Sequence, residues 1–375
     1  MKIWAATLLA VMTLASSWSV RGADLPPGIA PLFRCPAQYS NEFGNYKSLL
    51  RFDDGRPVRG KSEWSERRKE IQTSWEKEVG RWPAVIENPR IEYLSATNRQ
   101  GFAQHRIRLE IAPGQTGEGY LLVPSGRGPF PAVVVPYYEP ESSVGLGSVK
   151  LRAFASDLTK RGFVSLAIGS PGGDARKPEL GEVACQPLAF LGYVAANCFN
   201  ALAHLPKVDP KRIGIVGHSY GGKWAMWGAC FYEKFACGVW SDPGIVFDDS
   251  RPNINYWEPW YLGQQTGPAR SPGLPSSKNP ATGAYQRLVH AGHDLHEVLA
   301  LMAPRPFLVS GGAEDQPGRW PALNRVNEVY QLLGAGNRVG MSNRPLHDPT
   351  PESNEQIYRF FEYFLGNAEF PTGNN

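Results

Sequence analysis

One serine of this sequence stands between two glycines, where a hydroxyl can serve as a nucleophile. Ser219 lies between Gly217 and Gly221 and completes the pattern G-x-S-x-G. Residues 212–217 before it are typical of a buried strand, and residues 221–235 after it are typical of a helix. A sharp turn from strand to helix exposes a serine hydroxyl, and the flanking glycines let the two elements approach closely. The pattern therefore predicts that Ser219 is a nucleophile and not only a turn residue.

A serine nucleophile needs a general base, and the base needs an acid that orients it. At nucleophilic turns of this kind the chain order is serine, then acid, then histidine. Asp315 follows the predicted strand of residues 305–312, and His347 follows the last predicted strand. We therefore expect His347 to be the base and Asp315 to be the acid. Asp242, which ends the preceding strand, is the alternative acid.

Backbone N–H groups are the expected donors to the oxyanion that such an attack creates. The N–H of Tyr220 directly follows the nucleophile at a helix N-terminus, where the helix dipole favours negative charge. A second donor is expected from the loop after the buried strand of residues 130–138, through the N–H of Tyr138 or Tyr137.

Segments typical of strands alternate with segments typical of helices along most of the chain. The expected strands are residues 90–96, 103–112, 117–126, 130–138, 163–173, 212–217, 236–242, 305–312 and 337–343. The expected helices are residues 62–79, 150–162, 186–205, 221–235, 294–303, 320–334 and 352–366. This alternation predicts an α/β protein with a doubly wound, mostly parallel sheet, extended at its N-terminus by a helix and by an antiparallel edge. Function in such sheets gathers at the carboxyl ends of the strands.

One segment, residues 247–285, is too long for a simple connection and interrupts the alternation. Loops of this length inside compact domains are usually functional. The segment is rich in aromatic residues, and we expect it to cover the site, with Trp257 and Trp260 as candidates for substrate binding. Sugar rings present C–H faces that can lie against such side chains, although the same residues can equally form a small core that anchors the loop.

The composition, 42% hydrophobic and 20% charged over 375 residues, is that of a globular protein. Lys2 and the short apolar run of residues 3–15 predict a signal peptide over residues 1–23, and residues 24–375 are expected to form one secreted or periplasmic domain. Loss of Lys2 and Arg21 lowers the formal charge from +4 to +2, so nothing points to a nucleic-acid partner. No later segment is apolar enough to predict a membrane span.

Neither the cysteines nor the histidines predict a metal site. The chain has five cysteines, an odd number, and no pair has the spacing C-x-x-C. His290, His293 and His296 lie only loosely on one helical face, and the pattern H-E-x-x-H is missing. Asp294, followed three residues later by Glu297, is instead typical of a helix start. We therefore expect neither a metal nor another cofactor.

Three stretches, "GHSYGGK", "DLHEVLALMAPRPFLVSGGAED" and "LHDPTPES", resemble the α/β-hydrolase carbohydrate esterases. The nearest in pattern are acetyl xylan esterase-like and glucuronoyl esterase-like proteins of bacteria, and the resemblance extends from about residue 62 to the last helix. It implies an α/β-hydrolase fold and serine ester hydrolysis through Ser219, His347 and an acid, without a metal.

Two positions bear on the substrate. Glucuronoyl esterases usually carry arginine directly after the nucleophile, whereas this chain has Tyr220, which puts specificity for uronate esters in doubt. Lys223 matches the lysine that contacts the sugar in that family, and it is a candidate for substrate binding; a lysine paired with a nearby carboxylate is the alternative. We expect the substrate to be an ester on a polysaccharide or its fragments, acetyl first and a uronate or aromatic ester second.

Two other classes of protein remain as alternatives. "GHSYGG" also resembles the serine peptidases of the prolyl oligopeptidase group, but too few residues precede the catalytic segment for their β-propeller. A catalytically silent binding protein on the same fold is expected to lack a member of the triad, whereas this chain has candidates for all three. The sequence does not predict an oligomeric state.

Overall fold

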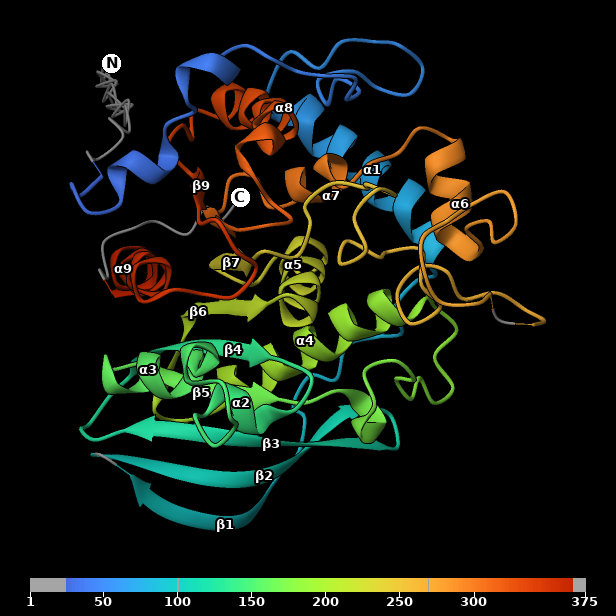
Figure 1. The fold of residues 1–375 in the computed structure, drawn as a ribbon. Coiled ribbons are helices and arrows are strands. Elements are labelled where there is room, and N and C mark those ends of the chain that lie inside the picture. The colour runs from blue at the N-terminus through green and yellow to red at the C-terminus, as the bar shows by residue number, and fades with distance from the viewer. Residues whose placement is uncertain (1–24, 100, 269, 367–375) are drawn as a thin grey trace, which may run out of the picture.

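A sheet of nine strands runs through the part of the chain that the computed structural model describes, residues 25–99, 101–268 and 270–366 (Figure 1). The expected signal peptide, residues 1–23, lies outside the described residues. In space the strand order is β1-β2-β3-β5-β4-β6-β7-β8-β9. The strands are β1 (Ile91–Arg99), β2 (Phe102–Ala112), β3 (Gln115–Pro124), β4 (Phe130–Pro136), β5 (Val164–Ile168), β6 (Val208–His218), β7 (Cys237–Ser241), β8 (Phe307–Gly311) and β9 (Val339–Asn343).

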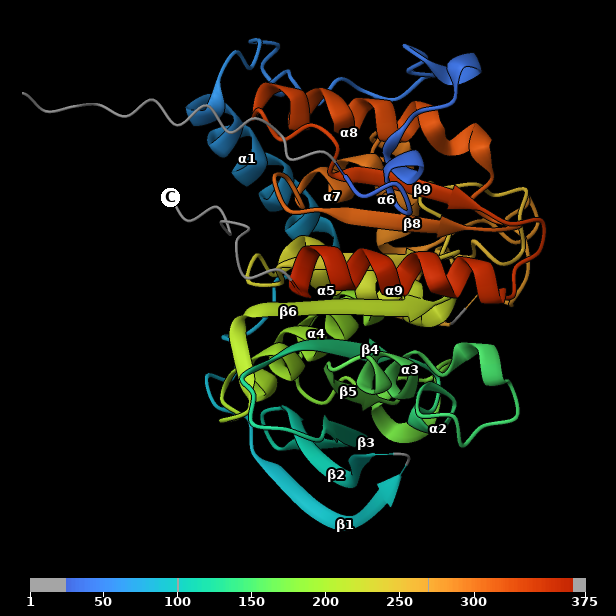
Figure 2. The same cartoon turned by 90° about the vertical axis from the view of Figure 1, so that its left-hand side faces the viewer.

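Helices cover both faces of this sheet (Figure 2). They are α1 (Lys61–Val79), α2 (Pro140–Ser143), α3 (Phe154–Lys160), α4 (Pro187–Ala203), α5 (Tyr220–Phe231), α6 (Gly283–His290), α7 (His296–Ala300), α8 (Trp320–Leu332) and α9 (Pro351–Gly366). One apolar core packs α1, α4, α5, α7 and α8 against one face of the sheet. A second core packs α3 and α9 against the other face. The predicted doubly wound α/β architecture is confirmed.

The sheet changes from antiparallel to parallel along its width, as the sequence predicts. β1, β2, β3 and β5 pair antiparallel with their neighbours at one edge. From β5 through β4 and β6 to β9 every pair is parallel. The parallel strands β5, β7 and β8 are buried along their whole length, which explains their continuous apolar runs, because both of their faces are covered.

The register of the central strands determines which residues leave the sheet next to one another at its carboxyl edge. His218 pairs with Ser241, and Ser241 pairs with Ser310 in the next strand. The residues that follow β6 and β7, Ser219 and Asp242, therefore leave the sheet side by side at its carboxyl edge.

The segment of residues 247–285 is held together by its own core and by one buried ion pair. Tyr256, Trp257 and Tyr261 are almost completely buried. Glu258 and Arg270 form an ion pair at 3.5 Å with side chains 4% and 3% exposed. The cover expected from the sequence is thus a packed element whose aromatic side chains mostly point inward.

Two further features of the described residues bear on the environment of the chain. No helix among residues 25–99, 101–268 and 270–366 has the length and apolar character that a membrane span requires. All five cysteines are unpaired thiols, and four of them are buried.

Candidate active site

The serine of the G-x-S-x-G pattern occupies a strained turn between β6 and α5. Ser219 has φ 53° and ψ −113°, a conformation that few residues other than glycine adopt. Its N–H donates to the carbonyl of Ser241 at 2.8 Å, which ties the turn to the neighbouring strand. The side chain of Ser219 is partly exposed at the N-terminus of α5, where the helix dipole stabilises negative charge. This is the arrangement of a nucleophile elbow.

The glycines on either side of Ser219 are required by close backbone contacts. A Cβ atom at Gly217 would lie 2.1 Å from the carbonyl oxygen of Gly221. A Cβ atom at Gly221 would lie 2.2 Å from the carbonyl oxygen of Pro136 at the end of β4. Both glycines therefore allow α5 to begin directly against the strands, as the pattern predicts.

His347 receives an orienting carboxylate, but from Asp242 and not from Asp315. The Nδ1 atom of His347 lies 2.7 Å from Oδ2 of Asp242. The carboxylate of Asp315 accepts instead the backbone N–H groups of Gly244 and Ile245, at 2.8 and 2.7 Å. The preference for Asp315 as the acid is therefore wrong for this geometry, because both of its oxygens face the loop after β7. The alternative, Asp242, directly follows the strand next to β6.

The loop that carries His347 is held by two arginines that the sequence reasoning missed. Arg344 is buried, and its guanidinium donates to the carbonyls of Ser310 and His347 at 2.7 and 2.6 Å. Arg152 donates to the hydroxyl of Tyr137 at 2.6 Å and pairs with Asp348, the residue after His347. In the sequence, only the position of Arg344, three residues before His347, could have indicated that an arginine holds this loop.

A second histidine, His218, packs against His347. The rings of His218 and His347 are 4.7 Å apart. Burial, followed by the nearby charges of His347 and Arg344, holds the pKa of His218 well below its usual value. The neutral form of His218 is therefore favoured.

The ring of Tyr138, which stacks on the buried ring of Tyr220, forms one wall beside Ser219. The rings of Tyr138 and Tyr220 lie 4.6 Å apart at an interplanar angle of 26°, and Tyr138 is 39% exposed. Burial raises the pKa of Tyr138 above its ordinary value, although a side-chain hydrogen bond with Ser219 acts in the opposite direction. The hydroxyl of Tyr220 is 3.0 Å from the hydroxyl of Ser170, so the side chain of Tyr220 points away from the nucleophile. The N–H of Tyr137 donates to the carbonyl of Ile168 at 3.0 Å, which leaves the N–H groups of Tyr220 and Tyr138 as the candidate oxyanion donors.

Lys223 and Trp257 do not present the open faces expected of substrate-binding side chains. Lys223 is 1% exposed; its ammonium donates to the carbonyl of Asn253 at 2.9 Å and lies 5.0 Å from the ring centre of Tyr256. Burial lowers the pKa of Lys223 to about 8, whereas Asp315 and other acids act in the opposite direction. Trp257 is 1% exposed and donates its indole N–H to the carbonyl of Gly273. The reason in both cases is that residues 247–285 fold over these side chains.

Trp260 differs from its aromatic neighbours because it keeps a partly exposed side chain. The guanidinium of Arg176 lies 6.0 Å from its ring centre. Tyr261, the next residue, lies 6.1 Å from the ring of Tyr220 and so links this tryptophan to the nucleophile turn. A role for Trp260 in substrate binding stays a prediction.

Two of the three histidines considered as metal ligands, His293 and His296, have protein partners, and His290 is exposed. Nδ1 of His293 lies 2.6 Å from Oε2 of Glu297, which also accepts the indole N–H of Trp75. Nε2 of His296 lies 3.0 Å from the carbonyl of Lys47. These contacts connect α7 to α1 and to the N-terminal segment, which is a structural role.

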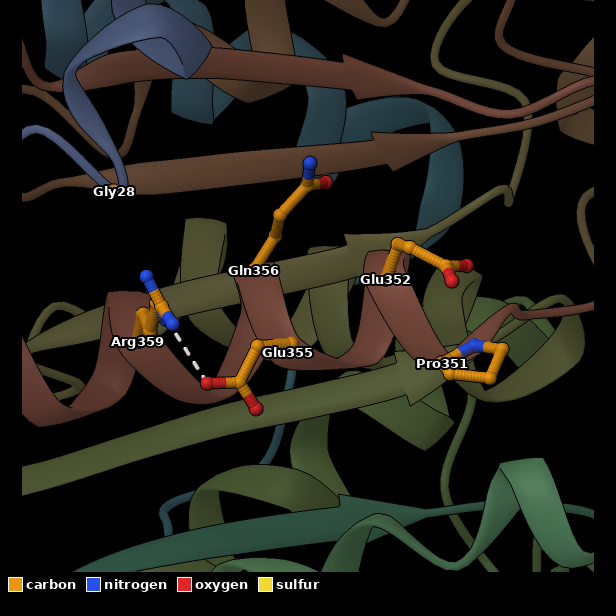
Figure 3. A pocket seen from close by; sticks show the side chains of 6 residues that line it. All are labelled: Gly28, Pro351, Glu352, Glu355, Gln356 and Arg359. Atoms are coloured by element: carbon orange, nitrogen blue, oxygen red, sulfur yellow. Dashed lines mark hydrogen bonds and ion pairs between the residues drawn. The ribbon is translucent and has the colours of Figure 1, made fainter.

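A shallow pocket of about 370 Å³ lies elsewhere, along α9 (Figure 3). It is lined by Gly28, Pro351, Glu352, Glu355, Gln356 and Arg359. None of these residues belongs to the predicted site, and Glu355 and Arg359 pair with each other at 2.9 Å. The pocket therefore adds nothing to the chemistry around Ser219.

The sheet order and the turn at Ser219 define an α/β-hydrolase fold. The family model described as Esterase FrsA-like matches residues 83–235, and that of the prolyl oligopeptidase family matches residues 195–315. A curated relative, Esterase FrsA of Vibrio cholerae serotype O1, is 31% identical over 147 residues, which are 38% of this chain and 31% of the relative. The chain thus matches about a third of the length of that relative.

Solved structures show the same fold over nearly the whole chain. A glucuronoyl esterase from Solibacter usitatus has a TM-score of 0.67 at 17% identity, covering 86% of this chain and 98% of the other. A putative acetyl xylan esterase from Bacteroides fragilis has a TM-score of 0.53 at 15% identity, covering 88% and 87%. The resemblance to α/β-hydrolase carbohydrate esterases is confirmed.

Proposed function

We propose that this protein is a serine carboxylic-ester hydrolase that acts on carbohydrate esters, with acetyl esters preferred. One observation carries the proposal: His347 and Asp242 are joined at 2.7 Å, and the ring of His347 lies 4.7 Å from that of His218, the residue before the strained, partly exposed Ser219. An oriented imidazole next to an elbow serine is the arrangement that activates a hydroxyl for acyl transfer.

In the proposed reaction, Oγ of Ser219 attacks the ester carbonyl carbon while Nε2 of His347 takes the hydroxyl proton. Asp242 accepts the Nδ1 proton of His347 in a hydrogen bond, which fixes the tautomer and stabilises the imidazolium. The N–H groups of Tyr220 and Tyr138 stabilise the oxyanion. Collapse of the intermediate expels the alcohol, which takes the proton from His347. Water then repeats the sequence on the acyl-enzyme, releases the acid and restores Ser219.

The preference for a small acyl group is supported by the wall beside Ser219. The partly exposed ring of Tyr138 forms this wall and stacks at 4.6 Å on the buried ring of Tyr220, the residue at the position of the arginine in the glucuronoyl esterase pattern. Such a wall favours an acetyl group over a uronyl group. The structural neighbours described as a glucuronoyl esterase and a putative acetyl xylan esterase make both esters worth testing.

A release assay on a panel of substrates tests the proposal. The panel holds acetylated xylan, a benzyl glucuronate ester, a feruloylated oligosaccharide and an aminoacyl amide, each incubated with the parent protein and with Ser219→Ala. We expect acetate release by the parent and almost none by the variant. Turnover that survives in Ser219→Ala contradicts the proposed nucleophile.

A serine peptidase is the second candidate, because the prolyl oligopeptidase family model matches residues 195–315. Cleavage of the amide without ester turnover selects this candidate. Inactivity on the whole panel, with Ser219 unreactive to an organophosphonate probe, points to a silent binding protein.

A further inference from the structure

Two loops at the carboxyl edge of the sheet hold each other through a reciprocal pair of buried carboxylates. Asp242, in the loop after β7, accepts at Oδ1 the N–H groups of Gly312 and Asp315, at 2.7 and 2.9 Å. Asp315, in the loop after β8, accepts with its two oxygens the N–H groups of Gly244 and Ile245. Each loop thus supplies the carboxylate that binds the backbone of the other. Both side chains are fully buried.

This exchange turns Oδ1 of Asp242 toward the loop after β8 and Oδ2 toward His347, with the N–H of Glu314 shared between the two oxygens at 3.2 and 3.3 Å. Asp242 has φ 53°, which is costly for a residue other than glycine and persists only where the surroundings hold it. The bonds from Asp315 fasten the chain two and three residues after Asp242. Gly312 leaves the space in which the carboxylate lies, since a Cβ atom there would be 2.7 Å from Oδ2 of Asp242.

We propose that Asp315 is a positioning residue of the hydrolase, which holds the loop after β7 so that Asp242 stays aligned with His347. The inference rests on the proposed function, because it assigns a role toward that triad. It explains why a carboxylate stands at the end of β8 although it does not touch the histidine. Asp315 acts through Asp242 and has no contact with the reacting atoms.

The charges around Asp242 and Asp315 are consistent with a role of Asp315 in holding the loop after β7. The cations that face Asp315 come from three further segments: Lys223 in α5, Arg319 before α8 and Arg344 after β9. Burial, and then the neighbouring carboxylate of Asp242, raise the pKa of Asp315. The ammonium of Lys223, buried among these acids, balances their negative charge, so its position requires no bound substrate.

The first test compares Asp315→Asn with a matched control, Asp294→Asn. Asparagine at 315 replaces one acceptor oxygen with an N–H₂ group that faces a backbone N–H. Asp294 is partly buried, and both of its backbone donors, the N–H groups of Phe247 and Leu295, bind the same oxygen, so asparagine keeps both bonds. With an aryl acetate as substrate we expect kcat of Asp315→Asn to fall about 10- to 100-fold with little change in KM. Asp294→Asn should keep the parent kcat.

A double-mutant cycle separates positioning from general destabilisation. Asp242→Asn alone should lower kcat about 10³- to 10⁴-fold, as expected for loss of the orienting acid. If Asp315 acts through Asp242, adding Asp315→Asn to Asp242→Asn should change kcat by no more than about twofold. Losses that multiply overturn the proposal. Equal kcat values for Asp315→Asn, Asp294→Asn and the parent overturn it as well.

A spectroscopic measurement tests the geometry without turnover. The far-downfield ¹H NMR signal of the His347 Nδ1 proton, bonded to Asp242, should weaken or move upfield in Asp315→Asn and remain in Asp294→Asn. Should Asp315→Asn fail to fold, Tyr256→Phe replaces it, because the hydroxyl of Tyr256 binds the carbonyl of Gly244 at 2.8 Å. An unchanged signal and kcat in the folded variant contradict the proposal. Turnover retained by Ser219→Ala would instead remove the proposed function itself.

Discussion

At the scale of single residues, the site combines a strained serine with side chains contributed by distant parts of the chain. Ser219 and His347 were predictable, because a short local pattern marks the first and chain order after the last strand marks the second. The carboxylate that binds His347 was predictable only as a choice between Asp315 and Asp242. Two adjacent strands each end near an aspartate, and the choice depends on how the two loops turn back on each other. The sequence pattern contains no information on that turn.

The hydroxyl of Tyr138 offers a test at this scale, because it interacts with the side chain of Ser219. We expect Tyr138→Phe to lower kcat about tenfold with KM nearly unchanged, since one hydrogen bond near the reacting atoms is lost. Tyr193→Phe is the matched control, because the hydroxyl of Tyr193 binds the carbonyl of Ala84 away from the site. Steady-state kinetics on an aryl acetate gives both numbers. Parent-like kcat in Tyr138→Phe would show that this hydroxyl is not used.

At the scale of elements, the position of the site depends on how closely strands and helices approach. The parallel register of β6 and β7 brings Ser219 and Asp242 to one level, and α5 begins against the end of β4. The alternation of strands and helices made this arrangement predictable. The interior of residues 247–285 was not, because aromatic residues in a long loop can equally face a ligand or one another.

The contact between α5 and β4 predicts a large effect of a single methyl group. Gly221→Ala forces a Cβ atom to within 2.2 Å of the carbonyl of Pro136, so the helix must shift. We expect the free energy of unfolding to fall by about 2 to 4 kcal/mol, together with a marked loss of activity. Gly336→Ala is the control, because nothing lies within 4 Å of a Cβ atom there. Urea denaturation measures both variants, and similar midpoints for the two would contradict the close contact.

The buried ion pair in residues 247–285 predicts how this segment responds to loss of charge. Glu258→Gln keeps an acceptor for the N–H of Gly273 but leaves the guanidinium of Arg270 buried without its counter-charge. Breaking a buried pair in this way costs about 3 to 5 kcal/mol. We expect faster hydrogen exchange confined to this segment, measured by mass spectrometry. As a control, Glu355→Gln removes a partner of the more exposed Arg359 and should leave exchange there unchanged.

At the scale of the whole molecule, buried charge links stability to pH. The side chains of Asp242, Asp315, Glu314 and Lys223 are buried close to the site, and Asp294 is partly buried beside α7. The sequence could indicate acidic residues near strand ends, but not their burial, because burial depends on contacts between segments far apart in the chain.

The pKa of Asp294 determines whether this group makes stability rise or fall with pH. Burial raises its pKa to about 7 in the folded protein, from an ordinary value of 3.8. Between these two pH values the folded state binds more protons than the unfolded state, so this group makes stability fall as pH rises from about 4 to about 7. The full effect is on the order of 4 kcal/mol as an upper bound. Asp294→Asn removes the titration and keeps both backbone hydrogen bonds.

We therefore expect Asp294→Asn to gain stability relative to the parent as pH rises. Urea unfolding at pH 5, pH 6.5 and pH 8 measures this difference directly. The variant should lie closest to the parent, or below it, at pH 5 and should exceed it most at pH 8, because only the parent must then hold a buried negative charge. A difference between the two proteins that is the same at all three pH values would mean that the pKa of Asp294 is not raised by folding.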